Sequence, residues 1–440
     1  MRLKHLKNNI MIKIGIIGGS GLDNPEILQD FKELDLETPY GKPSSVITCG
    51  KLSGVDVCII SRHGKKHEIT PTHVNNKANI YALTKLGCKY IIATSAIGSL
   101  REEIKPCEFV IPNQLIDFTK HREITFHDNF EEGIVHASLA EPFSRELGER
   151  LVESCVELGF KVHKKATLIT IEGPRFSTKA ESLLFRQWGA DIINMSTAPE
   201  ASLAREAGVQ YSVIAMSTDY DCWKESEEPV SWGIIEKRMH ENSENVKKII
   251  AKTIEKFSEE EFLKKDLQII KESIRTIPNF PKPGIMFRDI TTLMKNPEAM
   301  RKTIDILVKR FKDRKIDVIA GIESRGFIFG AILAEKLGAR FVLIRKPGKL
   351  PHEVERQEYE LEYGKDAVEI HKDAIEQGDK VVIVDDLVAT GGTAQATTRL
   401  IEKLGGKVEE CDFVIELPEL RGREKLKNYS VFSIIKFEGE

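Results

Sequence analysis

The segment at residues 381–393 constrains the fold more than any other part of this chain. It reads VVIVDDLVATGGT, and its continuous β-branched run is typical of a strand buried on both faces. Two carboxylates, Asp385 and Asp386, follow the run, and a turn of small residues then leads into a helical pattern over 394–404. Backbone N–H groups in such a turn, with a helix N-terminus behind them, suit a phosphate. Because the carboxylates would repel phosphate but can accept hydrogen bonds from ribose hydroxyls, the segment predicts a ribose-5-phosphate site.

Length and composition indicate a two-domain globular protein that binds small molecules. A chain of 440 residues exceeds one ordinary core. Its formal net charge is only -3, with acids and bases interspersed, which predicts no nucleic-acid or membrane partner. No apolar run approaches the roughly 20 residues of a membrane span. The seven cysteines lack zinc-type spacing, so we expect buried thiols and a cytoplasmic location. The basic first residues lack the apolar core of a signal peptide, and Met11 is an alternative start.

Alternating short apolar runs and helical patterns predict an α/β fold in both halves of the chain. We expect a first domain over residues 11–257 and a smaller second domain over residues 267–440. The charged segment 258–266 (SEEEFLKKD) between them carries no apolar periodicity. It therefore predicts a short linker, with a helix continuing from the preceding residues as the alternative.

Three further segments of the second domain sharpen its interpretation. They are PNFPKPGIMFRD at 278–289, GIESRGFIF at 321–329, and IRKPGKL at 344–350, which leads into a polar stretch expected to lack regular structure up to residue 364. Together with the first motif they resemble adenine phosphoribosyltransferases of the type I phosphoribosyltransferase family. The resemblance implies a mainly parallel sheet and the reaction of adenine with phosphoribosyl pyrophosphate (PRPP) and Mg²⁺ to give AMP.

The same resemblance implies roles for individual residues. PRPP-binding residues would be Asp385 and Asp386 at the ribose, Ala389, Thr390, Gly391, Gly392 and Thr393 at the 5′-phosphate, and Arg325, Arg345, Lys346 and Lys349 at the pyrophosphate. The adenine edge would meet the backbone of Met286 and Arg288, Glu362 would accept a proton from the base, and residues 346–360 would form a lid. Substrate oxygens and water would hold the Mg²⁺, so no metal site made by the protein is expected.

In the first domain, small, hydroxyl and basic residues follow several predicted strands. Ser20 lies in GIIGGSGL, Arg62 and His63 lie in SRHG, and Ser95 and Ala96 lie in TSAIGS. Because strand ends of an α/β sheet converge on one crevice, we expect these groups to share a site. Hydroxyls, a guanidinium and an imidazole that face one point predict a phosphate pocket.

With IEGPRFST at 171–178, NMSTAPE at 194–200 and STDYDCW at 217–223, the first domain resembles nucleoside phosphorylases, specifically those that cleave 5′-methylthioadenosine. This implies a central mixed sheet and phosphorolysis to adenine and 5-methylthioribose-1-phosphate. Phosphate would contact Ser20, Arg62, His63, Ser95, Ala96 and Ser196. Phe176 would lie against the base, Met195 against the ribose, Trp232 and Ile235 around the 5′ substituent, and His136 in a neighbouring subunit's site.

Asp219 and Asp221 indicate whether the first domain accepts adenine or a 6-oxopurine as its base. Residues two apart in an extended segment point to the same side. Adenine is a poor leaving group as an anion, so N7 must be protonated as the glycosidic bond breaks. A buried carboxyl beside another carboxylate has a raised pKa and can be that acid, while the second can accept a hydrogen bond from the 6-amino group. A site for 6-oxopurines would favour an amide instead.

Together the two resemblances predict a bifunctional purine-salvage enzyme in which the first domain releases adenine and the second consumes it. One alternative is a phosphorylase regulated by a second domain that senses PRPP without turnover. Another is a first domain with broader purine nucleoside specificity. The phosphorylase relatives are trimers and the phosphoribosyltransferase relatives are dimers, so a chain that keeps both contacts would close as a hexamer.

Overall fold

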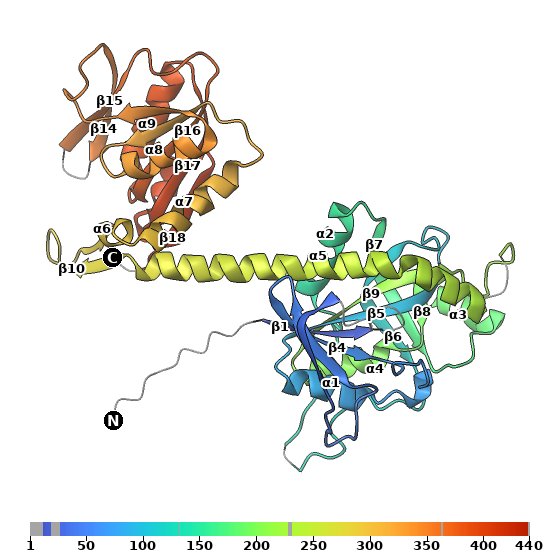
Figure 1. Cartoon of the computed structure of the whole chain (residues 1–440). Coiled ribbons are helices and arrows are strands. Elements are labelled where there is room, and N and C mark those ends of the chain that lie inside the picture. The colour runs from blue at the N-terminus through green and yellow to red at the C-terminus, as the bar shows by residue number, and fades with distance from the viewer. Residues whose placement is uncertain (1–11, 19–26, 132, 228–230, 362–363, 439–440) are drawn as a thin grey trace, which may run out of the picture. The chain divides into compact units, whose positions relative to one another are not determined.

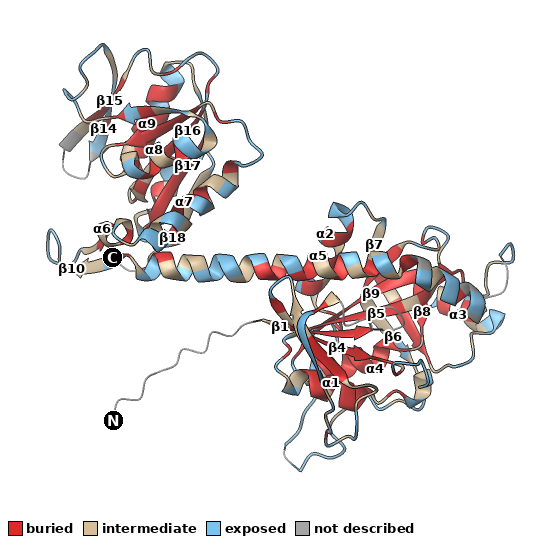
Figure 2. Cartoon of the chain, in the orientation of Figure 1, coloured by how far each residue is buried: buried red, intermediate tan, exposed pale blue. Residues whose placement is uncertain are grey.

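The computed structural model describes residues 12–18, 27–131, 133–227, 231–361 and 364–438 (Figure 1). The chain divides into two compact units, Met1–Glu261 and Phe262–Glu440. Both units alternate strands and helices, as the apolar patterns predict, and in both the strands form the buried centre (Figure 2). Each unit is described by itself.

The first domain is built on a nine-stranded sheet in the order β2-β3-β4-β1-β5-β8-β7-β6-β9. β5 also pairs with β9, so β5, β8, β7, β6 and β9 form a closed ring. Parallel pairs such as β1 with β4 coexist with antiparallel pairs such as β3 with β4, which confirms the mixed sheet. The strands are β1 (Lys13–Gly18), β2 (Gln29–Leu34), β3 (Ile47–Leu52), β4 (Val55–Ser61), β5 (Tyr90–Ser99), β6 (Phe109–Phe118), β7 (Val162–Ile171), β8 (Ile192–Asn194) and β9 (Gln210–Asp219).

Helices cover this sheet and begin where the sequence supplies caps. The Thr178 side chain accepts a hydrogen bond from the Glu181 backbone, and the Glu181 side chain accepts one from the Thr178 backbone, so the two form a capping box. The helices of the domain are the 3₁₀ helix η2 (Pro71–His73), α1 (Asn76–Lys85), α2 (Arg145–Glu157), α3 (Lys179–Gln187), α4 (Thr197–Glu206) and the long α5 (Trp232–Glu272).

The second domain has a five-stranded sheet in the order β13-β12-β16-β17-β18. Every adjacent pair in it is parallel, which confirms the predicted parallel sheet. Two antiparallel pairs, β10 with β11 and β14 with β15, lie outside it. The strands are β10 (Arg275–Pro278), β11 (Met286–Asp289), β12 (Val318–Ile322), β13 (Arg340–Ile344), β14 (Val354–Leu361), β15 (Gly364–His371), β16 (Lys380–Val388), β17 (Lys407–Glu416) and β18 (Val431–Lys436), and the helices are α6 (Thr291–Met294), α7 (Pro297–Phe311), α8 (Gly326–Leu337), α9 (Gly392–Lys403), η3 (Pro418–Leu420) and α10 (Gly422–Lys425).

The segment 258–266 is helical and does not form an irregular linker, so the alternative interpretation of this stretch is the right one. Helix α5 runs through it without a break. Its apolar stripe ends at Phe257 in the first core and resumes at Leu267, which packs against the second core ahead of the fully buried Ile270. Between them, ion pairs anchor the exposed turns: Glu260 with Arg150 of α2 at 2.5 Å and Asp266 with Lys302 of α7 at 2.5 Å. The missing periodicity therefore reflects solvent exposure and not the end of a helix.

The polar stretch up to residue 364 is also more ordered than predicted. Strands β14 and β15 pair in antiparallel register from Val354 with His371 to Leu361 with Gly364. The side chain of Tyr359 on β14 is buried and packs in the core of the domain with Val368 of β15. Charged residues on the exposed face hide this alternation in the sequence.

Two of the cysteines also depart from the expectation of buried thiols. Cys49 on β3 and Cys58 on β4 lie directly opposite each other and form a disulfide, with Cα atoms 4.2 Å apart. Strand register brings them together, and register is not visible in the spacing of cysteines along the chain. Cys107 is an exposed thiol.

Asp412 of β17 is fully buried in the second core, and neither of its carboxylate oxygens accepts a hydrogen bond from the residues that the structure describes. Burial, and then the negative charge of Glu410, raises its pKa well above the usual range. A raised folded-state pKa means that stability falls as pH rises above the unfolded value of roughly 4. We therefore expect Asp412→Asn to raise the melting temperature, with a gain of about 1–3 kcal/mol that is larger at pH 8 than at pH 5.

Scanning calorimetry of the full chain across this pH range tests the expectation. Asp305→Asn on the exposed side of α7 is the matched control and should leave the second-domain transition unchanged. A loss of stability in Asp412→Asn at pH 8 would contradict the argument.

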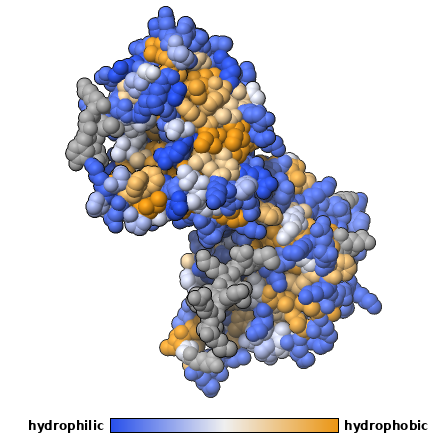
Figure 3. Space-filling view, turned by 60° about the vertical axis from the view of Figure 1, so that its left-hand side comes forward, coloured by the Kyte–Doolittle hydropathy of each residue, from blue (hydrophilic) through white to orange (hydrophobic). Residues whose placement is uncertain are grey.

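Hydrophilic residues cover much of the face seen in Figure 3, and apolar residues gather there in separate patches. Among the described residues no helix combines the length and the apolar character needed to span a bilayer.

Candidate active sites

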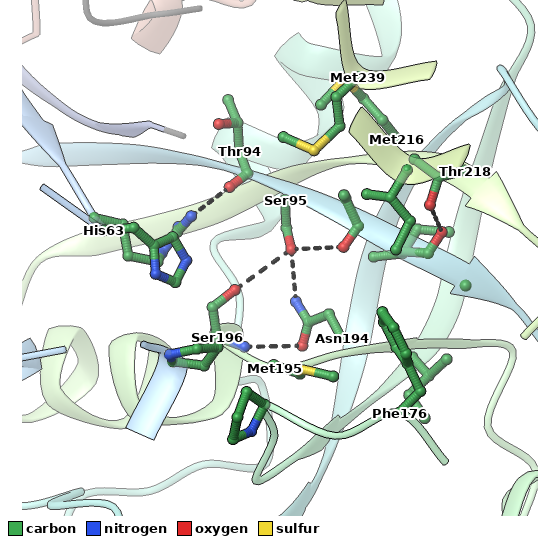
Figure 4. A pocket seen from close by; sticks show the side chains of 18 of the residues that line it. His63, Thr94, Ser95, Phe176, Asn194, Met195, Ser196, Met216, Thr218 and Met239 are labelled. Carbon is green, nitrogen blue, oxygen red and sulfur yellow. Dashed lines mark hydrogen bonds between the residues drawn. The ribbon is translucent and has the colours of Figure 1, made fainter. Parts of the chain in front are cut away.

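A cavity of about 390 Å³ in the first domain collects most of the residues that the sequence predicts for phosphate and nucleoside binding (Figure 4). Strands β5 and β9, the turn after β4 and helix α5 all contribute to its wall. The predicted residues that line it are Arg62, His63, Ser95, Ala96, Phe176, Met195, Ser196, Asp219, Asp221 and Ile235.

Three of the residues predicted to bind phosphate or nucleoside are not among those that line the cavity. Ser20 lies outside the described residues. Trp232 begins helix α5, but its side chain is likewise outside the described part of the chain. His136 is exposed, and its ring contacts the Phe130 ring with centroids 5.5 Å apart. The prediction for His136 concerned a neighbouring subunit, so it stays a prediction.

A buried ion pair fixes Arg62 at one side of the cavity. Its Nε lies 2.5 Å from Oε1 of Glu200, and Nη2 lies 3.1 Å from Oε2 of the same carboxylate. Nη1 donates to the Thr94 carbonyl at 2.8 Å, and the Tyr211 hydroxyl donates to Glu200 at 2.7 Å. Both charged side chains are almost completely buried, at 3% and 0% exposure. Burial alone would lower the pKa of Arg62, but the Glu200 charge more than offsets this, so the guanidinium stays charged and oriented.

Asn194 organises the hydroxyl groups beside Arg62. Its amide nitrogen donates to Ser95 Oγ at 2.9 Å, and its amide oxygen accepts from Thr170 Oγ1 at 2.9 Å. Ser95 Oγ lies 3.4 Å from Ser196 Oγ. Two hydroxyls are thereby aligned next to a fixed cation, which is an arrangement suited to the oxygens of one small anion.

His63 faces the cavity as a neutral side chain. Burial, and then the positive charge of Arg62, lowers its pKa to about 4. Its Nδ1 lies 2.8 Å from the Ile69 carbonyl oxygen, so Nδ1 carries the proton of the neutral ring. The Nε2 atom is then an acceptor and can receive a hydrogen bond from a protonated anion or a hydroxyl.

Asp219 and Asp221 lie together in the same cavity, as the sequence predicts. Asp219 ends β9, whereas Asp221 adopts a positive φ of 50°, so a turn and not an extended segment brings the second carboxylate in. Asp219 accepts hydrogen bonds from Thr218 Oγ1 at 2.7 Å and from the Asp221 backbone at 2.8 Å. Burial still raises the pKa of Asp219 to about 6 and also raises that of Asp221. One of the two can therefore hold a proton near neutral pH.

Sequence reasoning identified Ile235 but missed the rest of the apolar wall and the residues that hold the phosphate-side groups from behind. Ile235, Met239 and Val246 all face the cavity from α5, at a spacing that places them on one side of the helix. This periodicity was a usable signal for Met239 and Val246. Glu200 and Asn194 stand inside the recognised segment 194–200, where a lone carboxylate among small residues is a signal that could have identified a buried partner for a cation.

The second candidate site lies where β16 ends. The Asp386 backbone N–H donates to Asp385 Oδ1 at 2.8 Å, and Nε of Arg325 lies 2.8 Å from Asp386 Oδ2. Burial, and then the charge of Asp386, raises the pKa of Asp385 well above its usual range. Burial also raises the pKa of Asp386. The pair can therefore share a proton and can both donate and accept hydrogen bonds.

The turn at 389–393 leads into helix α9 as predicted. Gly391 has a φ of 74° and caps the helix, a conformation that glycine adopts without strain. The backbone of this turn packs directly on Gly422: a Cβ atom at Gly391 would collide with the Gly422 carbonyl, and a Cβ atom at Gly422 would collide with the Ala389 carbonyl. Gly422 thus supports the turn from a distant part of the sequence. The remaining members of the turn, Thr390, Gly392 and Thr393, follow in the same segment.

The predicted pyrophosphate-binding cations are all paired with carboxylates. Arg345 Nε lies 3.3 Å from Glu323 Oε2, and Lys349 pairs with Glu323 as well. Lys346 pairs with Asp366. Neither acid was identified from the sequence, because each lies on a neighbouring segment that only the fold brings near.

The remaining predicted residues are on β11 or outside the described part of the chain. Met286 begins β11, and Arg288 in the same strand is buried and donates to Thr276 Oγ1 at 2.5 Å. The Phe287 ring between them lies 6.0 Å from the Arg325 guanidinium, so β11 is close to the end of β16. Glu362 lies outside the described residues.

Comparison with known proteins divides the chain in the same way. Residues 13–255 match the phosphorylase superfamily, and residues 289–440 match the phosphoribosyl transferase domain. S-methyl-5′-thioadenosine phosphorylase of Xenopus tropicalis is 48% identical over 275 residues, which is 62% of this chain and 98% of that protein. The Thermofilum pendens protein of the same name is 51% identical over 57% of this chain and 94% of its own length.

Solved structures give the same result for the first domain. A methylthioadenosine phosphorylase from an antarctic soil metagenomic library has a TM-score of 0.54 and 43% identity, and covers 57% of this chain and 87% of that chain. Methylthioadenosine phosphorylase from Schistosoma mansoni, in complex with adenine, has a TM-score of 0.53 and 38% identity over 55% of this chain and 91% of that chain.

Proposed function

The chain belongs to the phosphorylase superfamily through residues 13–255 and carries a phosphoribosyl transferase domain at residues 289–440, and from this premise we propose a bifunctional pentosyltransferase. Its first domain cleaves 5′-methylthioadenosine with phosphate, and its second transfers the phosphoribosyl group of PRPP to the released adenine. The single observation that carries the proposal is the Asp219–Asp221 pair, because it shares one cavity with Arg62 and the aligned hydroxyls.

In the first reaction, phosphate binds beside Arg62, Ser95 and Ser196 and attacks the ribose carbon as the bond to the base breaks. Arg62 holds the negatively charged phosphate next to the positive charge that develops on the ribose. Burial raises the pKa of Asp219 to about 6, so a fraction of the enzyme holds this proton near neutral pH and can donate it to N7 of the leaving purine. Asp221 accepts a hydrogen bond from the 6-amino group, which favours adenine over 6-oxopurines.

The second reaction rests on the turn at 389–393 and on Asp385 and Asp386. Backbone N–H groups of the turn and of α9 bind the 5′-phosphate, and the carboxyl pair binds the ribose hydroxyls. A Mg²⁺ ion would enter with PRPP, held by the substrate's own oxygens and water. That ion would neutralise charge on the pyrophosphate leaving group. Arg325, Lys346 and Lys349 assist when they exchange their carboxylate partners for pyrophosphate.

One assay with the full chain tests both activities. Methylthioadenosine, phosphate and Mg²⁺ are supplied with and without PRPP, and the purine products are separated and quantified. We expect adenine without PRPP and AMP with it. Adenine in both samples would reject the second activity and favour a domain that senses PRPP without turnover. Equal cleavage of inosine in a substrate panel would instead indicate a broader purine nucleoside phosphorylase.

We expect Gly422→Ala to abolish AMP formation and to leave phosphorolysis unchanged. The added methyl group would collide with the Ala389 carbonyl and displace the phosphate-binding turn. PRPP binding, measured by calorimetry, should weaken by at least about a hundredfold if two charge-assisted hydrogen bonds are lost. Lys427→Ala, an exposed substitution nearby, is the control. Normal PRPP binding by Gly422→Ala would contradict the assigned role of the turn.

A further inference from the structure

The hydroxyl of Tyr359 connects residues from three segments of the second domain. Lys346 Nζ donates to it at 2.7 Å, and Thr393 Oγ1 donates to it at 3.1 Å. The hydroxyl itself donates to Asp366 Oδ2 at 3.0 Å. Thr393 belongs to the proposed 5′-phosphate site and Lys346 to the proposed pyrophosphate site, so one side chain contacts both ends of the site at once.

Packing holds this hydroxyl in place. Tyr359 is buried on β14, in the same core cluster as Val388 and Ala394, which flank the phosphate-binding turn. Its ring lies against Gly392, where an added Cβ atom would be 3.2 Å from Cδ2. A side chain packed in this way has little rotational freedom, so little entropy is lost when its hydroxyl orders Lys346 and Thr393.

The hydrogen bond between the Tyr359 and Thr393 hydroxyls can persist when a phosphate is bound. A threonine hydroxyl has one proton and two acceptor positions. When a phosphate occupies the turn, the Thr393 hydroxyl can donate its hydrogen bond to the phosphate and accept one from the Tyr359 hydroxyl, which then no longer donates to Asp366. Tyr359 can still accept from Lys346 after this reversal, because its oxygen keeps a lone pair for the ammonium group.

We propose that Tyr359 is a positioning residue that holds Lys346 and Thr393 at the separation required by the two phosphate-bearing ends of PRPP. The proposal rests on the proposed function of the second domain. Tyr359 does not touch the reacting atoms and acts through the two residues that it joins. The link adds little to the affinity for a ligand that carries only the 5′-phosphate. It adds its full contribution to the affinity for a ligand that also carries a pyrophosphate.

Calorimetric titration of the full chain with PRPP and, separately, with AMP tests the proposal. For Tyr359→Phe we expect the affinity for PRPP to fall about tenfold, as for one lost hydrogen bond to a charged group, and the affinity for AMP to fall less than about threefold. Tyr429→Phe is the matched control, because it removes a hydroxyl that lies 2.9 Å from Glu402, at the opposite end of α9 from Thr393. In a Lys346→Met background, Tyr359→Phe should no longer distinguish PRPP from AMP.

Each outcome is decisive. Equal losses for PRPP and AMP, or no loss for either ligand, would overturn the positioning role. If Tyr359→Phe lowers the melting temperature markedly, the comparison between Lys346→Met and the double variant still measures the coupling. Failure of the wild-type chain to bind PRPP would instead reject the proposed function of the domain, so the two failures are distinguishable.

Discussion

We expect Asp219→Asn to lower kcat/KM for 5′-methylthioadenosine by roughly 10²–10⁴-fold, the usual contribution of a general acid. The amide cannot donate a proton to N7 and release it as an acid does. The proposed partner of the 6-amino group is Asp221, so Asp221→Asn, whose amide can donate a hydrogen bond to a 6-oxo group, should raise the ratio of inosine to methylthioadenosine cleavage. Steady-state phosphorolysis of both nucleosides measures the two effects.

The pH profile gives an independent test of the same residue. Asp219 must be protonated to act, and burial raises its pKa to about 6. The wild-type kcat/KM for methylthioadenosine should therefore fall about tenfold for each pH unit above that value, and Asp219→Asn should lose this dependence. The exposed Asp35→Asn, whose only ion-pair partner among the described residues is the exposed Lys42, is the control for the charge change. An unchanged profile in Asp219→Asn would assign the acid to another group.

Replacing Glu200 with alanine destabilises the first domain by about 3–5 kcal/mol, because it leaves the Arg62 guanidinium buried without its counter-charge. The Tyr211 hydroxyl loses its acceptor in the same step. Thermal or urea unfolding of the full chain measures the loss. Removal of Glu149, whose ion pair with Arg145 is exposed, is the control and should leave the melting temperature unchanged.

A milder variant separates stability from binding. Glu200→Gln keeps an acceptor for Arg62 but removes the charge that orients it. We expect KM for phosphate to rise while KM for the nucleoside stays close to wild type, because Arg62 and not the base site is affected. A parallel rise in both constants would mean that Glu200 supports the whole cavity and not the phosphate end.

Local patterns were sufficient for the α/β class, and the resemblance to known families supplied the parallel sheet of the second domain and most of the residues that gather in the first cavity. Those features depend on strand ends and short motifs, which the sequence displays directly. Exposed charged residues mask the periodicity of the β14–β15 hairpin, which escaped prediction, and of helix α5, whose continuity was predicted only as the alternative. Glu323 and Asp366 escaped because an ion pair between distant segments is visible only after the chain has folded.

Helix α5 supplies side chains to both domains. Its first turns line the nucleoside cavity through Ile235 and Met239, and its last turns supply Ile270 to the other core. No loop separates the two roles, so any division of the gene between residues 232 and 272 cuts a helix. A shortened chain that ends at Phe257 retains the cavity wall but loses the ion pair of Arg150 with Glu260. A second domain produced by itself needs the last turns of α5 to complete its core, which sets where the two domains can be separated by truncation.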